Sequence, residues 1–181
     1  MSNQALIIID LQNDYFPGGK WELHDIEKAA QNAVQILEDA REKNIPVFHV
    51  HHEFLLENPP FFAPNSDGAA IHESLKPRDG EATILKHQVN SFRDTNLKGL
   101  LDEKGIEDVT IIGAMSHMCI DAATRAAADF GYQVTVVEDA CASRGLEFEG
   151  KTVKAEDVHA AYMSALGFAY ANVISTQTYL G

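Results

Sequence analysis

The chain has 181 residues, of which 45% are hydrophobic, and its 14 basic and 27 acidic side chains give a formal net charge of −13. A chain of this length and apolar content can bury a core of its own, which excludes a disordered protein and makes a disulfide or structural metal unnecessary. The acidic balance would repel nucleic acids and anionic membranes, so we expect a small-molecule partner.

Buried strands and amphipathic helices alternate along the chain. Residues 5–9 are a continuous apolar run rich in isoleucine, which is typical of a strand buried on both faces of a parallel sheet. Between residues 26 and 43 the apolar side chains recur every three or four positions, which predicts an amphipathic helix. The alternation continues, with strands expected at 46–51, 82–86, 108–113, 133–137 and 172–175 and helices at 97–104, 120–130 and 155–171.

Six strands that alternate with helices predict an α/β fold of the doubly wound type. We expect a three-layer αβα arrangement around a mostly parallel six-stranded sheet, with the Rossmann-like strand order 3-2-1-4-5-6. Residues 1–181 would then form a single domain.

One segment, at about residues 54–81, breaks this alternation. It contains four prolines and three phenylalanines (Phe54, Phe61 and Phe62) without a clear period. Long irregular inserts in compact domains are commonly lids or binding loops, so we expect a lid or a subunit interface; the alternative is a surface excursion with aromatic anchors. An exposed cluster at residues 59–62 would favour a homo-oligomer, either a dimer or a tetramer.

The chain has two cysteines, Cys119 and Cys141, too few for a disulfide scaffold or a four-thiolate zinc site. The N-terminal apolar run has no basic residues before it and ends at Asp10, which is unlike a signal peptide or a membrane span. These features favour a cytoplasmic protein.

Three residues that could carry chemistry follow predicted strands. Asp10 follows the first strand, Lys86 ends the third, and Cys119 lies near the start of the helix after the fourth, so all three are expected at the carboxyl edge of the sheet. A cation or a helix N-terminus lowers the pKa of a thiol and makes it nucleophilic. Each residue also has an ordinary structural explanation: an inert buried cysteine, a helix cap at Asp10, and a solvated strand-end charge at Lys86.

The segment 113–119 contains small residues at the end of a strand. Such a turn can direct backbone N–H groups toward an oxyanion. A plain strand-to-helix turn with Ser116 as N-cap is the alternative, and the two are compatible.

These residues resemble the isochorismatase-like cysteine hydrolases, a family that includes nicotinamidases and N-carbamoylsarcosine amidases. The resemblance is carried by residues 10–14, 86–92 and 113–124, and it extends over nearly the whole chain. It implies a catalytic triad of Asp10, Lys86 and Cys119. It further implies a cis peptide between Ala114 and Met115, and an oxyanion hole formed by the backbone amides of Met115 and Cys119.

A cysteine at position 119 favours C–N hydrolysis within this family, because the vinyl-ether cleavage of isochorismate needs no thiol nucleophile. The resemblance therefore implies a cysteine-dependent hydrolase of an amide, ureide or lactam-like group, acting through an acyl-thioester and without a cofactor. Apolar side chains with a few polar groups should form the pocket. The candidates for substrate binding are Asn13, Tyr15, Phe16, Trp21, His52, His87 and His117, together with the phenylalanines of the insert.

Two other classes of function stay open. His49, His51, His52 and Glu53 cluster at the end of the second strand, with His72 in the insert, and could serve a metal-assisted, nicotinamidase-like hydrolase. Alternation along a strand allows at most two of these histidines to converge without a loop. The resemblance to nicotinamidases, which hold a metal near this place through an aspartate and a histidine two residues on, implies His51 and Glu53 as the closest metal candidates, although these two depart from that pattern. A catalytically inactive small-molecule-binding homologue would need neither the metal nor the thiol.

Overall fold

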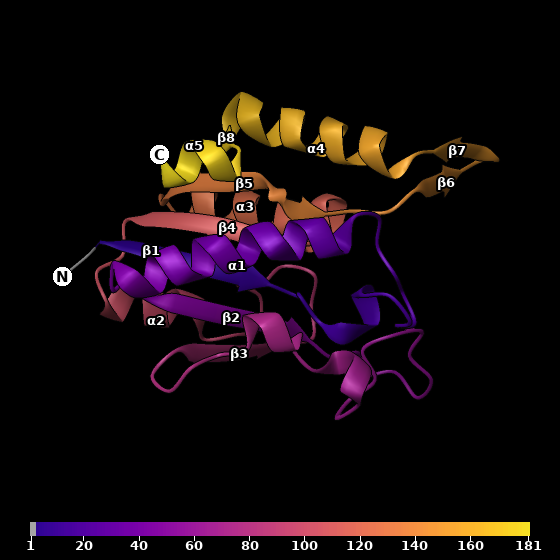
Figure 1. Cartoon of the computed structure of the whole chain (residues 1–181), viewed down its shortest axis with the longest axis horizontal. Coiled ribbons are helices and arrows are strands. Elements are labelled where there is room, and N and C mark those ends of the chain that lie inside the picture. The colour runs from indigo at the N-terminus through magenta and orange to yellow at the C-terminus, as the bar shows by residue number, and fades with distance from the viewer. Residues whose placement is uncertain (1–2) are drawn as a thin grey trace.

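A computed structural model describes residues 3–181 of the chain. Its main sheet has six parallel strands in the order β3-β2-β1-β4-β5-β8 (Figure 1). The strands are β1 (Gln4–Ile9), β2 (Val47–His52), β3 (Ala82–Lys86), β4 (Asp108–Ala114), β5 (Gln133–Ala142) and β8 (Asn172–Ile174). The predicted order is confirmed, since β8 is the sixth strand of this sheet.

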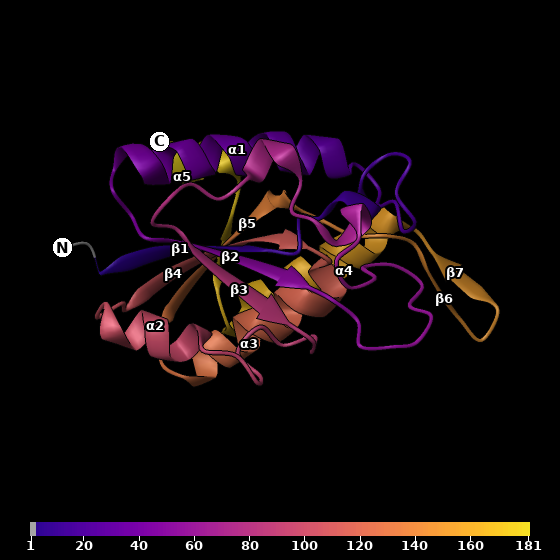
Figure 2. The ribbon, with the colours of Figure 1, turned by 90° about the horizontal axis from the view of Figure 1, so that it is seen from below.

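Helices cover both faces of the sheet, as Figure 2 shows. One face carries α1 (Ile26–Glu42) and the short α5 (Thr176–Leu180), and the other carries α2 (Leu97–Glu103), α3 (Asp121–Asp129) and α4 (Ala155–Ala169). The isoleucines of β1 alternate between the two apolar cores that result, which explains why this strand is buried on both sides. Within the described residues, none of the helices combines the length and apolarity that a membrane crossing requires.

The structure adds elements that the sequence pattern did not predict. Strand β5 continues to Ala142, five residues beyond the predicted end, and pairs with β4 across a bulge between Ile111 and Gly113. A separate hairpin, β6 (Leu146–Phe148) with β7 (Lys151–Val153), then projects from the domain (Figure 1). A π-helical turn, η4 (Ser116–Ile120), precedes α3. All three features lie at the carboxyl edge of the sheet or lead away from it.

The aromatic side chains of the insert pack onto the domain, whereas other parts of the insert are exposed. It contains two short 3-10 helices, η2 (Asp67–Ala69) and η3 (Glu73–Leu75). Phe61 and Phe62 are 7% and 1% exposed, so the expectation of an exposed cluster at residues 59–62 is wrong for its two phenylalanines. The reason is aromatic packing, because both rings contact Tyr15 of the short 3-10 helix η1 (Asn13–Tyr15).

Candidate active site

Asp10, Lys86 and Cys119 come together at the carboxyl edge of the sheet. Asp10 follows β1 with a left-handed backbone (φ 54°), Lys86 is the last residue of β3, and Cys119 lies in η4 after β4. Their exposed fractions are 0%, 0% and 6%. Parallel strands bring their carboxyl ends to one edge, which is why residues so distant in sequence meet here.

The Lys86 ammonium is the centre of this cluster. Its Nζ lies 2.8 Å from Asp10 Oδ2 and donates to Cys119 Sγ at 3.3 Å. It also contacts His52 Nδ1 at 2.9 Å and donates to the Gln88 carbonyl at 3.2 Å. A solvated strand-end lysine is therefore the wrong description. A helix-capping role for Asp10 is also wrong, because the nearest helical turn begins at Asn13 and has Gln12 at its N-cap.

Burial and charge set the protonation states of the cluster. Burial raises the pKa of the Cys119 thiol well above its usual range, the Asp10 charge raises it further, and Lys86 only partly offsets both. Burial alone would lower the pKa of Lys86, but the Asp10 carboxylate and the Cys119 sulfur outweigh it and the pKa is raised. Burial and then the Lys86 charge lower the pKa of His52 to about 4. The resting site therefore holds a thiol, an ammonium and a neutral imidazole.

The turn before Cys119 contains a cis peptide and a carbonyl that accepts two hydrogen bonds. The peptide between Ala114 and Met115 is cis, at the position where the resemblance implies it. The Met115 carbonyl accepts from the amides of Met118 and Ile120 at 3.0 and 3.2 Å, which commits that carbonyl to η4. Ser116 is not an N-cap, because its hydroxyl donates to the Ala142 carbonyl at 3.1 Å.

Three of the predicted substrate-binding residues, His52, Tyr15 and His117, lie at the cluster or in the turn of Cys119, and a fourth, Trp21, packs on the insert. Besides His52, Tyr15 is buried, and its pKa is raised by burial and then by the charges of Cys119 and Asp10. His117 lies two residues before Cys119 and contacts Ser143 Oγ at 2.8 Å. Trp21 stacks on Phe61, with ring centroids 4.7 Å apart.

The other three predicted substrate-binding residues have different surroundings. Phe16 stacks on His72 and lines a cavity of about 460 Å³ against α1, to which none of the three clustered residues contributes. Asn13 donates to the Asp67 carbonyl at 2.8 Å within the insert. His87 is exposed and contacts the Glu53 carbonyl at 2.7 Å.

The histidines of β2 are divided among separate partners. His49 Nε2 contacts Glu81 Oε2 at 2.8 Å, whereas His52 faces Lys86. Across residues 3–181 there is no group of three histidine, cysteine, aspartate or glutamate side chains placed to hold a metal. His51 and Glu53 do line one cavity of about 490 Å³, but Glu53 accepts from the Asn65 amide at 3.0 Å.

Glu81 is the centre of a second polar network, which joins the end of the insert to α1 and β2. Arg41 donates to both of its carboxylate oxygens, at 2.7 and 2.9 Å, and His49 adds the third side-chain contact. Burial alone would raise the pKa of Glu81, but these hydrogen bonds and that from the Arg78 amide lower it to about 2. The carboxylate is therefore held in its charged form.

Sequence reasoning missed three polar groups near the cluster. The buried Gln12 amide donates to the carbonyls of His52 and Ala69 and accepts from the His52 amide, which binds the insert to the end of β2. Arg144 lies over the Trp21 ring, 4.2 Å from its centroid. Ser116 contacts His159 of α4 at 2.8 Å. A polar residue three positions after the end of a buried strand was a usable signal for Gln12, whereas the other two pairs arise from tertiary packing.

Comparison with known proteins identifies the family. The model of the isochorismatase domain matches residues 4–177. The chain belongs to the isochorismatase family. The uncharacterized isochorismatase family protein YddQ of Bacillus subtilis (strain 168) is 50% identical over 176 residues, which cover 97% of this chain and 98% of YddQ.

Two further isochorismatase relatives bear on fold and chemistry. The crystal structure of a putative isochorismatase hydrolase from Oleispira antarctica superposes with a TM-score of 0.95 at 54% identity, covering 99% of this chain and 97% of that one. A maleamate amidohydrolase of Pseudomonas putida is 25% identical over 190 residues, covering 96% of this chain and 83% of the relative. The family and its three-layer αβα fold agree with the sequence-based prediction.

Proposed function

We propose that this protein is a cysteine-dependent hydrolase that cleaves a C–N bond of a small molecule. The observation that carries the proposal is the buried contact set in which Lys86 joins the Asp10 carboxylate to the Cys119 sulfur. The named activity of the maleamate amidohydrolase relative supports the same reaction type. Asp10 has the role of general base, Lys86 of cation and Cys119 of nucleophile.

The first half-reaction forms an acyl-enzyme. Because burial raises the pKa of Cys119, the thiol is protonated at rest, and Asp10 takes its proton as the sulfur attacks the carbonyl carbon. The backbone amides of Met115 and Cys119 donate to the resulting oxyanion. As the C–N bond breaks, protonated Asp10 returns the proton to the leaving nitrogen, and an amine or ammonia departs from the acyl-thioester.

The second half-reaction regenerates the thiol. Asp10 removes a proton from water, whose oxygen attacks the thioester carbonyl at the same pair of amides. The C–S bond then breaks, the proton passes from Asp10 to the sulfur, and the carboxylic acid is released. The Lys86 ammonium stays charged throughout and balances the negative charge that moves between Asp10 and Cys119.

We further propose that the preferred amide also carries an acidic group, because the cation Arg144 lies close to the turn that holds Cys119. Arg144 lies over Trp21, and no ion pair is found for its guanidinium in the part of the chain that the structure describes. Ser143, its neighbour in the sequence, contacts His117 of η4, and burial and then the Arg144 charge lower the pKa of His117. An Arg144→Gln variant should raise KM for carboxylated amides about tenfold, the loss of one charge-assisted contact, and leave neutral amides unchanged. Equal KM changes for both kinds of amide would contradict this choice of substrate.

We further propose that the protein is a homo-oligomer in the cytoplasm, where Cys119 stays reduced. Leu55 and Leu56 of the insert and Phe148 of the β6–β7 hairpin are 72%, 58% and 74% exposed, and such apolar surface is typical of a protein contact. Sedimentation equilibrium should therefore show a dimer or tetramer. A monomer at all working concentrations would refute the assembly.

The function is tested by a screen of amides, ureides and lactams with detection of released ammonia or amine. Turnover should disappear in Cys119→Ala, while mass spectrometry of the wild-type reaction should detect an acyl adduct on Cys119. Turnover that survives in Cys119→Ala but is lost after chelation would instead support a metal-assisted hydrolase. Binding without turnover by the wild type would support an inactive binding homologue.

A further inference from the structure

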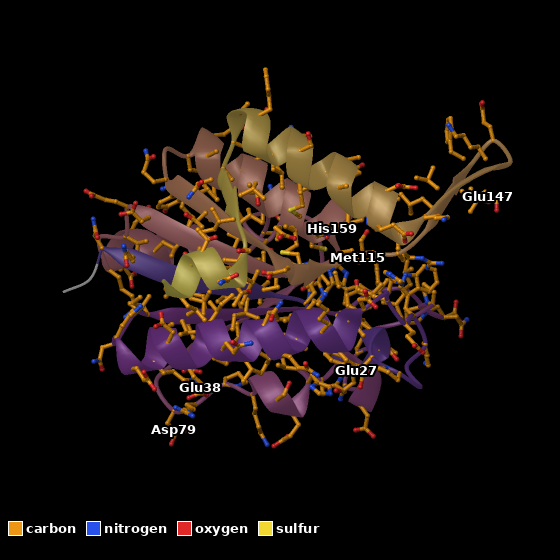
Figure 3. All side chains as sticks on the ribbon, turned by 45° about the horizontal axis from the view of Figure 1, so that its top comes forward. Glu27, Glu38, Asp79, Met115, Glu147 and His159 are labelled. Carbon is orange, nitrogen blue, oxygen red and sulfur yellow. The ribbon has the colours of Figure 1, made fainter. Side chains whose placement is uncertain are left out.

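A line of polar contacts outside the catalytic cluster connects α4 to the turn that carries Met115. Ser116 Oγ donates to the Ala142 carbonyl at 3.1 Å and lies 2.8 Å from His159 Nδ1. His159 Nε2 in turn lies 3.6 Å from Glu138 Oε2. Ser116 is fully buried, so bulk water does not reach its hydroxyl. Figure 3 labels Met115 at the turn and His159 on α4.

The single hydroxyl proton determines the direction of these hydrogen bonds. A carbonyl oxygen can only accept, so the Ser116 proton points to Ala142, and the Ser116 oxygen must accept from His159. This requires a proton on His159 Nδ1. The opposite tautomer would place two oxygens 3.1 Å apart in a buried site with no proton between them, which is unfavourable because both carry partial negative charge. His159 is therefore held with Nδ1–H toward Ser116.

We propose that His159 and Ser116 are positioning residues that hold the Met115 segment in place for oxyanion binding. The inference rests on the proposed function, because the Met115 amide is an assigned oxyanion donor there. The Met115 carbonyl is already committed to the amides of η4, and the Ser116 side chain fixes the next residue to the end of β5. Because these contacts hold the Met115 carbonyl and the Ser116 side chain, they also fix the direction in which the Met115 N–H points.

His159 also borders a cavity outside the catalytic cluster. His159 lines a cavity of about 220 Å³ together with His24, Lys28 and Glu138, and its side chain is 23% exposed. The His159 side chain is therefore partly exposed, while its Nδ1 is committed to Ser116. Neither edge contacts Cys119, so its effect on the reaction runs through the turn and not through the reacting atoms.

The test compares two substitutions at His159. Asn can place an amide N–H where Nδ1–H stands, whereas Leu cannot, so His159→Leu should lower kcat about tenfold or more with KM unchanged and His159→Asn should restore most of it. Loss of a whole oxyanion donor costs about 10²–10³ in kcat, and a misdirected donor loses part of that. His24→Leu is the matched control, because His24 lines the same cavity and its side chain does not contact the turn.

Two further measurements separate positioning from a general loss of structure. Alkylation of Cys119 by iodoacetamide needs no oxyanion, so its rate should be the same in His159→Leu and wild type. A parallel fall in alkylation and kcat, or an unchanged kcat, would overturn the inference.

In ¹⁵N NMR spectra the wild type should show Nδ1–H on His159, and Ser116→Ala should remove this preference. An Nε2–H tautomer in the wild type would overturn the inference even if no amide were hydrolysed. Failure of the proposed function is recognised separately, by full turnover in Cys119→Ala.

Discussion

Replacing Lys86 by methionine tests the structure and the proposed chemistry together. Methionine keeps most of the length of the side chain but removes the charge, which leaves the Asp10 carboxylate buried without the cation 2.8 Å away. Removing one partner of a buried ion pair costs about 3–5 kcal/mol, because the remaining charge has lost its compensation. For a domain of this size the loss corresponds to a fall in Tm of about 6–20 °C.

The double variant Asp10→Asn/Lys86→Met separates stability from activity. Without the carboxylate there is no uncompensated charge, so most of the lost stability should return, to within about 1.5 kcal/mol of wild type. Turnover should stay absent, because the proposed base is gone. Urea unfolding at pH 7 measures the free energy of unfolding of the wild type, Asp10→Asn, Lys86→Met and the double variant. Ammonia release measures activity in the same samples.

Two results would refute this reasoning. If Lys86→Met lost less than about 1 kcal/mol, Asp10 and Lys86 would not form a buried ion pair. If the double variant hydrolysed the substrate at the wild-type rate, neither side chain would take part in catalysis, and the assignment of base and cation would be wrong.

Three other substitutions have definite expected outcomes. Cys141→Ala should retain wild-type turnover, because burial raises the pKa of this thiol to about 12 and it donates to a carbonyl at 3.4 Å; loss of turnover would place it in the site. The Glu81 carboxylate stabilises the fold above its ordinary pKa of 4.5, and this stabilisation is lost as the pH falls toward 2, so Glu81→Gln should lower the free energy of unfolding by about 1.5–3 kcal/mol at pH 7. The free energy of unfolding of the variant should also fall less steeply with pH below 5 than that of wild type, and an equal pH dependence of the two would contradict this. Gly68→Ala places a methyl group against the Asp14 carboxylate, so KM should rise and limited proteolysis within residues 54–81 should become faster. Gly99→Ala is the control, because a methyl group at Gly99 meets no neighbouring atom, and unchanged KM and proteolysis in Gly68→Ala would show that the insert does not need this contact.

Residues at strand ends could be predicted because the topology of a parallel sheet brings them together. Asp10, Lys86 and Cys119 each follow an apolar run that is recognisable as a strand, and the carboxyl ends of such strands share one edge. The end of β5 could not be predicted in this way. Glu138 and Asp139 interrupt its apolar run, and only the pairing with β4 extends the strand to Ala142.

Contacts that depend on where a helix packs could not be predicted from the sequence pattern, for a different reason. His159 meets Ser116 because of where α4 lies on the sheet, and periodicity tells which face of a helix is apolar but not which turn of it faces a given loop. The aromatic insert shows the same limit. The sequence shows Phe61 and Phe62 as an apolar cluster, but whether the cluster is exposed depends on the Tyr15 ring that covers it.

The segment from Asp10 to Asp14 links the proposed catalytic cluster to the insert. Asp10 faces Lys86, whereas Asp14 accepts from the Phe62 amide at 2.7 Å and from the Lys20 amide at 3.1 Å. Gln12, between them, donates to the Ala69 carbonyl at 2.7 Å. The insert is therefore attached to the same strand end that supplies the proposed base. We therefore expect substitutions elsewhere in the insert to leave Asp10 in place, because these attachments do not depend on the exposed part of the insert.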